Sequence, residues 1–406
     1  MTDPTPTLGE RVAFHRKRHG LSQVELGRLI GRSESWVSQV ERNTRKVDRL
    51  SVLTQVADVL NVSVSDLAPD APIEATAVEH EPWREALRLA LTGHPALSAL
   101  FEPLPLDDGV EGEELADRVE QAWSLVHASR YSEAGPLLVE LIVALESAVR
   151  SVPADRRPVL AGALARAYQA VGALFGKVDD VEAAWLASDR ALFAAELAAN
   201  PALVAAGQHR LALALLGAGR LQQSRHAASS GTATLRPHLA SSGVELASAL
   251  GALYLVEAIG AARAGDRSAA WRAIEEADRL ASTVGAGRND FNTEFGPSNV
   301  ALHGVAVAVE LGDAGDALDR AGRVDPSGLS PERRARFLVD VARAHAQRRA
   351  RGEEVAALLE AEEIAPEQIH DHGTVRMLIR DLLQDPNRRS DQQLRALADR
   401  CGVPIQ

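Results

Sequence analysis

Residues 23 to 40 contain four positions whose types and spacing are those of a helix-turn-helix, and the chemistry this predicts is the reading of DNA. Counting Gln23 as the first position, the fifth, ninth, fifteenth and eighteenth are Gly27, Gly31, Val37 and Val40. The fifth must be small because the two helices touch there, and the ninth favours glycine because the tight turn needs a positive φ. The two valines are expected to hold the second helix against the first. The pattern therefore favours a DNA-binding helix pair over a plain helical hairpin.

Short motifs within and beside this pair resemble a known family. Leu21-Ser22-Gln23, the run 37–42 and the length of the unit, residues 8–68, look like the phage-repressor (Xre/Cro-type) DNA-binding domain. In that family the second helix lies in the major groove and the first crosses the DNA backbone. The resemblance implies that bases are read by polar residues around the start of the second helix, namely Ser33, Glu34, Ser35, Ser38 and Gln39.

The side-chain chemistry of these candidates is unequal. A glutamine such as Gln39 can pair with adenine through two hydrogen bonds, and serines such as Ser35 and Ser38 can donate or accept. Glu34 could accept from a cytosine amino group, but a carboxylate near phosphates is costly, so its alternative role is to support Ser35 or Arg32. We expect Ser35, Ser38 and Gln39 to matter most.

The same resemblance implies phosphate contacts on both sides of the reading helix. The family places such a contact at the helix N-terminus occupied here by Gln23. The full set of candidates is Gln23, Arg32, Trp36, Thr44, Arg45, Lys46 and Arg49. Trp36 has an alternative role in the domain core, with partial exposure, and the charged residues could simply form a solvated face.

Three further positions follow the family's internal architecture. Arg16 and Glu41 match its ion pair between the first helix and the reading helix, so we interpret both as structural. Asn43 stands where glycine usually ends the reading helix. Asparagine is the next most tolerant residue in the left-handed conformation, so we expect the turn to persist.

A second polar pattern lies far along the chain. Asn299, His303 and Glu310 share one face of a predicted helix, which follows the segment 292–297. Amide and imidazole groups on such a face can bind a peptide backbone or the carbonyl groups of a small lactone. The candidate effector-binding residues are Arg166, Gln169, Gln208, Tyr254, Glu257, Asn292, Phe295, Asn299 and His303. Each could instead be an ordinary solvated position.

Signals of enzymatic chemistry are weak. Residues 172–178 resemble a phosphate-binding loop, but three residues separate the glycines instead of four, and Val178 replaces the metal-binding Ser or Thr. His370 and His372 are two residues apart and cannot share one helix face. We find no serine or cysteine in a recognisable nucleophile turn. We therefore expect no enzyme, no metal and no cofactor.

The elements that position the DNA-reading residues are five short helices. We expect them at 8–18, 23–30, 34–42, 49–60 and 63–68. Ser22 followed by Glu25 has the pattern of a capping box, and Ser33 should cap the third helix. The second helix is expected to bury Val24 and Leu26, together with Leu29 or Ile30.

The rest of the chain shows a helical repeat. A turn followed by a small residue five positions later begins at Ser129, Gly219, Gly265 and Gly312, with a weaker member at Gly176, and the successive steps are 47, 43, 46 and 47 residues. Such steps indicate stacked helical hairpins. The turns resemble tetratricopeptide junctions, although that repeat usually has ~34 residues. The predicted pairs are 113–149, 155–199, 200–236, 241–285, 295–323 and 330–364, followed by helices at 366–384 and 390–401.

Charge and composition support this division. The chain has 406 residues, of which 46% are apolar, and a formal net charge of −12. Residues 8–68 hold ten Arg or Lys against seven Asp or Glu, whereas residues 69–406 hold 34 against 48. A basic head on an acidic body suggests that only the head meets a polyanion. The single cysteine, Cys401, excludes an internal disulfide framework and a Cys-rich zinc site.

The sequence gives no sign of a membrane location. Met1–Thr7 is short and polar, and the most apolar window, 243–262, contains Glu245 and Glu257. A spanning helix tolerates such charges poorly. We therefore expect a cytoplasmic protein that joins the bacterial nucleoid when bound to DNA.

These observations predict an all-α protein. A five-helix repressor-type helix-turn-helix domain (8–68) and a linker (69–81) precede an α-solenoid of stacked tetratricopeptide-like hairpins (82–401). The architecture is similar to bacterial peptide-sensing quorum regulators and their actinobacterial relatives. That resemblance implies a homodimer on a near-palindromic operator in double-stranded DNA, and a peptide or small-molecule effector bound by the body. The alternative is an adaptor whose repeats bind a partner protein and whose head tethers it to DNA.

Overall fold

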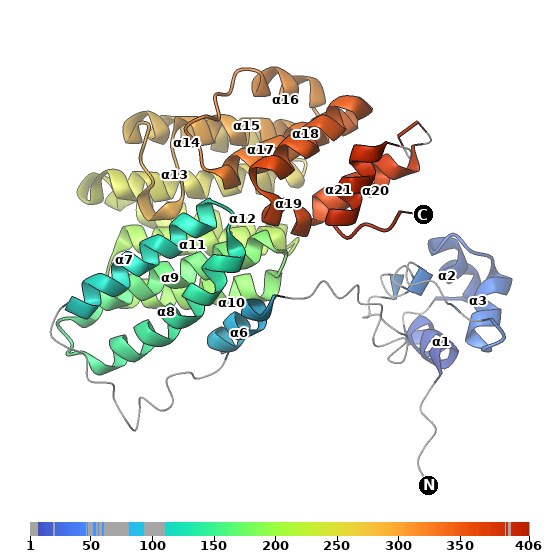
Figure 1. The fold of residues 1–406 in the computed structure, drawn as a ribbon, viewed down its shortest axis with the longest axis horizontal. Coiled ribbons are helices and arrows are strands. Elements are labelled where there is room, and N and C mark those ends of the chain that lie inside the picture. The colour runs from blue at the N-terminus through green and yellow to red at the C-terminus, as the bar shows by residue number, and fades with distance from the viewer. Residues whose placement is uncertain are drawn as a thin grey trace, which may run out of the picture. The chain divides into compact units, whose positions relative to one another are not determined.

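The computed structural model divides the chain into two compact units, residues 1–79 and 80–406, which we call the head and the body (Figure 1). It describes residues 7–18, 21–45, 47, 52, 53, 56, 59, 60, 81–92, 110–385, 387, 388 and 391–405. These residues form helices and turns without a strand. The all-α fold class is therefore confirmed. The fifth predicted helix of the head, most of the fourth and nearly all of the predicted linker lie outside the described residues.

The head begins with three helices, α1 (Leu8–Arg18), α2 (Gln23–Leu29) and α3 (Glu34–Glu41). Ser22 and Glu25 form the predicted capping box at the start of α2. At the start of α3, the Ser33 hydroxyl accepts a hydrogen bond from the Trp36 backbone N–H at 3.2 Å. Between the two helices Gly31 has a φ of +65°, as the turn requires. These local signals place the helix ends within a residue of their predicted positions.

The head core gathers apolar side chains from all three helices. It contains Val12, Leu26, Ile30, Val37, Val56 and Leu60. The prediction that Val24 is buried is wrong, because this side chain is 48% exposed. Side chains two positions apart on a helix point in directions that differ by about 200°. Because Leu26 points into the core, Val24 points toward solvent.

The body is a stack of six helical hairpins, which run in Figure 1 from α7 in teal to α18 in orange-red. The paired helices are α7 (Val110–His127) with α8 (Tyr131–Ser151), α9 (Arg157–Lys177) with α10 (Val181–Leu197), α11 (Pro201–Gly217) with α12 (Leu221–Leu235), α13 (Leu239–Arg263) with α14 (Arg267–Val284), α15 (Pro297–Glu310) with α16 (Ala314–Ala321), and α17 (Pro331–Gln347) with α18 (Arg351–Ile364). Short 3-10 turns, η2 (Arg236–His238) and η3 (Asp290–Asn292), join three of the pairs. All six predicted pairs are present.

Further helices flank the stack. α6 (Pro82–Thr92) packs on α8 and α10. At the other end lie α19 (Pro366–Asp371), α20 (Gly373–Gln384) and α21 (Gln392–Arg400). The sequence predicts one helix over 366–384, but the structure divides it at His372, whose backbone is extended (φ −77°, ψ 114°). The His372 Nδ1 atom accepts a hydrogen bond from the Thr374 N–H at 3.2 Å and so caps α20.

The repeat turns follow the predicted chemistry. Ser129, Gly219, Gly265 and Gly312 all have a positive φ, and the small residues five positions later are fully buried between the paired helices. The fifth and weaker repeat turn is present, but its left-handed residue is not the predicted one. In that turn the left-handed residue is Asp179, with a φ of 56°, and not Gly176.

Two helices of the body, Arg157–Lys177 and Gly243–Arg263, are long and apolar enough to cross a membrane by length and composition. In the structure 78% of each window is buried within the protein. Their apolar surface is therefore used in packing the hairpins.

Candidate nucleic-acid interface and effector site

Helix α3, the predicted reading helix, packs on the core of the head with one face and leaves the other face exposed. Val37 and Val40 are buried in the core of the head. Ser33, Glu34 and Ser35 are exposed, and Ser38 and Gln39 are half-buried. The Gln39 Nε2 atom lies 3.4 Å from the Ser35 hydroxyl as a donor. Residues 35, 38 and 39 lie three and four positions apart, so they share one face of the helix.

Gly27 sets how closely α2 approaches the start of α3. A Cβ atom at this position would lie 2.8 Å from the Arg32 carbonyl oxygen and 3.2 Å from the Ser33 carbonyl carbon. Both are backbone atoms, which cannot move aside as a flexible side chain can. The fifth position of the motif therefore requires glycine, because a side chain there would collide with the backbone at the start of α3.

The predicted ion pair between Arg16 and Glu41 is confirmed and extends to a third residue. The Arg16 guanidinium contacts the Glu41 carboxylate at 2.5 and 2.9 Å, and the Gln23 side-chain amide donates to the same carboxylate at 2.7 Å. Desolvation raises the pKa of Glu41, but the hydrogen bonds from Arg16 and Gln23 lower it more, to below its ordinary value. The Gln23 side chain thus joins α2 to α3, a role inside the head that adds to its predicted contact with a phosphate.

The other phosphate candidates lie around α3. Arg32, Thr44 and Arg45 are exposed, and the Thr44 hydroxyl donates to the Gln39 carbonyl at 3.0 Å. Trp36 is half-buried and packs on the head core, while the Arg32 guanidinium lies 5.8 Å from the centre of its ring. Lys46 and Arg49 lie outside the described residues.

Asn43 adopts the expected left-handed conformation, with a φ of 56°. Its side chain also accepts from the Gly9 N–H at 3.1 Å and donates to the Thr7 hydroxyl at 2.7 Å. The end of the reading helix is thereby tied to the start of α1. Sequence reasoning predicted the backbone conformation but missed this second role.

In the body, polar side chains converge where the first helices of several hairpins meet. This central polar cluster consists of His127, Lys177, Arg210, Asn292, Glu294, Asn299, His303, Glu332 and Arg333. It contains three of the nine effector candidates, Asn292, Asn299 and His303. The other members were missed, although the arginine-rich stretch 331–343 in an acidic body was a signal available in the sequence.

The three candidates are held firmly in this cluster. The Asn292 carbonyl accepts from Arg210 at 2.6 Å, and the Asn299 amide donates to the Thr293 carbonyl at 3.5 Å. The Asn299 amide oxygen is buried and has no hydrogen-bond partner among the described residues. His303 Nδ1 donates to the Asn299 carbonyl at 2.8 Å. Desolvation and the charge of Arg333 lower the pKa of His303 to about 4.

Acidic and basic groups of the cluster neutralise one another. Donor atoms of His127, Glu294 and Glu332 lie within 4.8 Å of each other, a spacing that could suit a metal. However, Arg333 pairs with Glu294 at 3.3 Å, and Lys177 pairs with Glu332. Burial lowers the pKa of Lys177 to about 8. The arrangement is that of a buried ion-pair network.

The remaining effector candidates lie elsewhere. Tyr254 bonds to Arg236 at 3.2 Å, and the charged neighbours of Glu257 are Arg225 and Arg272, on α12 and α14. Glu257 therefore faces the second helices of the hairpins, and Tyr254 contacts the turn η2, both away from the cluster. Arg166 pairs with Glu120 on α7.

Three candidates are used in packing. Phe295 is 1% exposed, and its ring lies directly against Gly251 of α13. Gln169 is fully buried and donates to the Leu203 carbonyl at 3.4 Å. The stem of Gln208 packs toward Gly231 of α12.

The last helices of the body contact its first hairpins. Helix α17 contacts α7. The Glu367 carboxylate on α19 accepts hydrogen bonds from the backbone N–H groups of Tyr131 and Ser132 at 2.7 and 2.9 Å and from the Ser132 hydroxyl at 2.9 Å. Arg84 pairs with Asp371. The row of hairpins thus closes on itself, through contacts that we call the closure.

Comparison with known proteins supports the assignment of the head. The model of the helix-turn-helix domain family matches residues 7–69. Over 86 residues the chain is 31% identical to the HTH-type transcriptional regulator SinR of Bacillus subtilis (strain 168), a match that covers 21% of this chain and 78% of SinR. Over 61 residues it is 34% identical to the uncharacterized HTH-type transcriptional regulator YazB of the same organism, covering 15% of this chain and 87% of YazB.

A comparison of structures covers more of the chain but is weaker. The crystal structure of Bacillus thuringiensis PlcR in complex with the peptide PapR7 and DNA covers 68% of this chain and 95% of PlcR, at 12% sequence identity and a TM-score of 0.26. A score at this level does not indicate a shared arrangement of the whole chain.

Proposed function

We propose that this chain, which belongs to the family of helix-turn-helix transcriptional regulators, binds an operator in double-stranded DNA through residues 8–68. The observation that carries the proposal is the polar face of α3, on which Ser35, Ser38 and Gln39 share one side while Val37 and Val40 are buried. A recognition helix needs this division, because one face must hold the domain together and the other must meet the base edges.

Base reading is assigned to three side chains. Gln39 can donate to and accept from an adenine, and Ser35 and Ser38 can bond to either kind of base edge. Ser33 and Glu34 lie at the N-terminus of α3. There the Ser33 hydroxyl is already used as a helix cap, so we give both residues a supporting role.

Phosphate contacts are assigned around these residues. Arg32 and Arg45 supply exposed donors, and the backbone N–H of Gln23 lies at the N-terminus of α2, where anions are favoured. Thr44 is exposed as well, but it would have to exchange the hydrogen bond from its hydroxyl to the Gln39 carbonyl for one to a phosphate. Lys46 and Arg49 stay in the set on sequence grounds. Such contacts set the position of the protein on DNA and make its affinity fall with salt.

The test is the double variant Ser38→Ala with Gln39→Ala in the full chain. We expect its affinity for a selected operator to fall about tenfold or more, because one good side-chain–base pair is worth ~1–3 kcal/mol. Weak, salt-dependent binding to unrelated DNA should be unchanged. The matched control, Gln222→Ala with Ser229→Ala, removes the same residue types from exposed positions of α12. Unchanged operator affinity of the α3 variant would refute the assignment.

For the body we propose sensing of an effector and dimerisation. A two-fold dimer would present two reading helices ~34 Å apart to a near-palindromic operator. The effector, a peptide or small signalling molecule, would act on the central polar cluster, where the unpaired Asn299 oxygen can accept a hydrogen bond. It can regulate only if it binds the closed and an open form of the body with different affinity. Gln169, Gln208 and Phe295 are left out of this site because they are used in packing.

Genome-wide mapping of bound DNA, with light scattering of the purified chain, tests these points. Paired half-sites one helical turn apart and a mass of two chains are expected. Single half-sites and a monomer would refute the dimer. Co-purification of a stoichiometric protein partner, with no peptide or small ligand in native mass spectrometry, would favour the adaptor role instead.

A further inference from the structure

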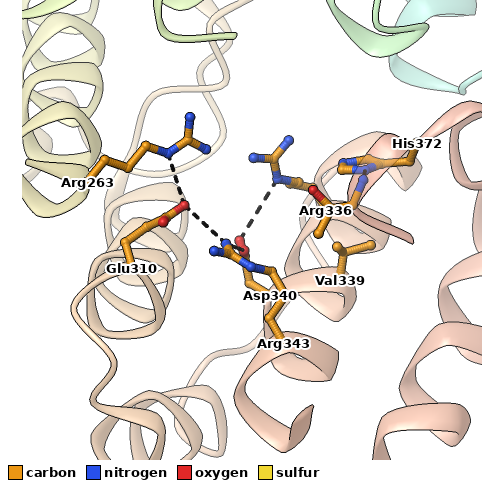
Figure 2. A pocket seen from close by; sticks show the side chains of 8 residues that line it. Arg263, Glu310, Arg336, Val339, Asp340, Arg343 and His372 are labelled. Carbon is orange, nitrogen blue, oxygen red and sulfur yellow. Dashed lines mark hydrogen bonds and ion pairs between the residues drawn. The ribbon is translucent and has the colours of Figure 1, made fainter. Parts of the chain in front are cut away.

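A small cavity lies between the later hairpins and the helix that follows them. It has a volume of about 210 Å³ and lies among α13, α15, α17 and α20. Figure 2 shows Arg263, Arg336 and Arg343 reaching toward the same space, with Glu310 on one side and His372 on the other. The other charged residue of the lining is Asp340. Three guanidinium groups against two carboxylates leave a positive lining in a body whose overall charge is negative.

The three arginines differ in how far they are already paired. Arg263 contacts Glu310 at 3.1 Å, and Arg343 contacts Glu310 at 3.2 Å and Asp340 at 3.0 Å. The Arg336 side chain is 43% exposed, and its contact with Asp340 is long, at 4.0 Å. Arg336 therefore has donors available to a ligand, whereas Arg263 and Arg343 mainly hold the two carboxylates.

His372 adds a neutral donor to the same cavity. Its Nδ1 atom accepts from the Thr374 N–H, so the ring proton is on Nε2. Burial and the charge of Arg336 lower the pKa of His372 to about 3. The imidazole is therefore uncharged at neutral pH and can donate one hydrogen bond through Nε2.

We propose that this cavity binds the oxyanion group of a compact ligand, a carboxylate or phosphate held by Arg336 and His372. Guanidinium groups match the paired oxygens of both anions and bind them through parallel hydrogen bonds. The excess positive charge disfavours a cation. Sites for drug-sized ligands have ~300–1,000 Å³, so a cavity of about 210 Å³ suits a ligand smaller than a drug molecule.

The cavity lies beside the closure. Asp371, which precedes His372, pairs with Arg84 of α6, and the Gly373 N–H donates to the Asp179 carboxylate at 2.7 Å. An oxyanion that joins Arg336 of α17 to His372 would hold this junction in place. The closed form of the body is then favoured by the ligand, a consequence that rests on the proposed sensing function.

The binding test uses the full chain with two probes, inorganic phosphate and citrate, at constant ionic strength. Phosphorus NMR line broadening follows phosphate, and calorimetry follows citrate. We expect at least one probe to bind, and Arg336→Gln to weaken it about tenfold, the usual effect of losing a charged hydrogen bond. Arg334→Gln, on the same helix but outside the cavity lining, is the matched control.

Each outcome decides the proposal. Preference for phosphate or for citrate identifies the ligand class. The site is overturned if neither probe binds at a concentration 10-fold above a millimolar Kd. It is also overturned if the wild type and Arg336→Gln bind the probe equally well. Operator affinity measured with and without the bound probe separates the two proposals. A probe that binds but leaves operator affinity unchanged refutes the sensing role, whereas the cavity assignment stands.

Discussion

One contact of the closure is a carboxylate that caps a helix far away in the sequence. Arg130, at the N-cap position of α8, makes no side-chain cap bond. Glu367 replaces that cap across 236 residues of chain by accepting from the Tyr131 N–H, and it also accepts from the Ser132 N–H. We therefore predict that Glu367→Ala opens the body locally without unfolding its hairpins.

The magnitude follows from the bonds that are lost. Removing a helix N-cap costs ~0.5–2 kcal/mol, and hydrogen bonds to a charged group are worth ~1.5–3 kcal/mol each but are not additive within one network. We expect a loss of about 2 kcal/mol, which raises the population of the open form by a factor of about 30. Glu367→Gln keeps one acceptor oxygen and should have roughly half this effect in free energy.

Hydrogen exchange of the full chain measures the opening. The amides of Tyr131 and Ser132 should exchange up to about 30-fold faster in Glu367→Ala. Glu363→Ala, an exposed carboxylate on α18, is the control and should leave both rates unchanged. If the two amides exchange at the wild-type rate in Glu367→Ala, the closure is not held by this carboxylate and the reasoning fails.

Three further predictions concern packing and pH. Gly27→Ala should destabilise the head by about 1–3 kcal/mol, because its Cβ meets backbone, and faster hydrogen exchange in α2 and α3 would show it. Gly31→Asn, at an open position with a positive φ, should cost less, and equal costs would contradict the packing argument. The pKa of Glu41 is lowered in the folded head, so its stabilisation is present above the unfolded value of ~4.3 and is lost as pH falls through the lower folded value. In the double variant Glu41→Leu with Arg16→Met, the free energy of unfolding of the head should therefore depend less on pH in the acid range. The pKa of His303 falls to about 4 on folding, so the unfolded chain binds a proton first, and the body should lose at most ~1.4 kcal/mol per pH unit from this group between pH ~6.5 and 4. Urea unfolding of His303→Asn at several pH values should show a shallower dependence, and an unchanged slope would contradict the buried neutral imidazole.

Much of the fold could be predicted because its signals are local. The Ser22 capping box, the positive φ at Gly31 and the small residue after each repeat turn depend on groups within a few residues of one another. The positions of α3 residues that face away from the core also follow from helical periodicity. These relations do not depend on how distant parts of the chain meet.

The effector region was predictable only in part, because it depends on how distant parts of the chain meet. Asn299 and His303 share a helix face, so the sequence brought them together, but the helix face alone did not say what lies opposite. Tyr254 and Glu257 fitted the same periodicity, and yet Tyr254 bonds to Arg236 of η2, and Glu257 has Arg225 of α12 and Arg272 of α14 as its charged neighbours. Which side of a hairpin lies inward depends on how successive hairpins rotate against each other.

The sequence by itself therefore determined the helix-turn-helix, the exposed polar face of α3 and the repeating hairpins, since caps, turns and periodicity are encoded within single elements. The tertiary structure decided that the Gln23 side chain is used inside the head, and that Glu367 reaches α8. It also decided that Arg336 and His372 share one cavity. These contacts join residues that are 18 to 236 positions apart, and their geometry is the sum of many small packing angles that no local pattern encodes.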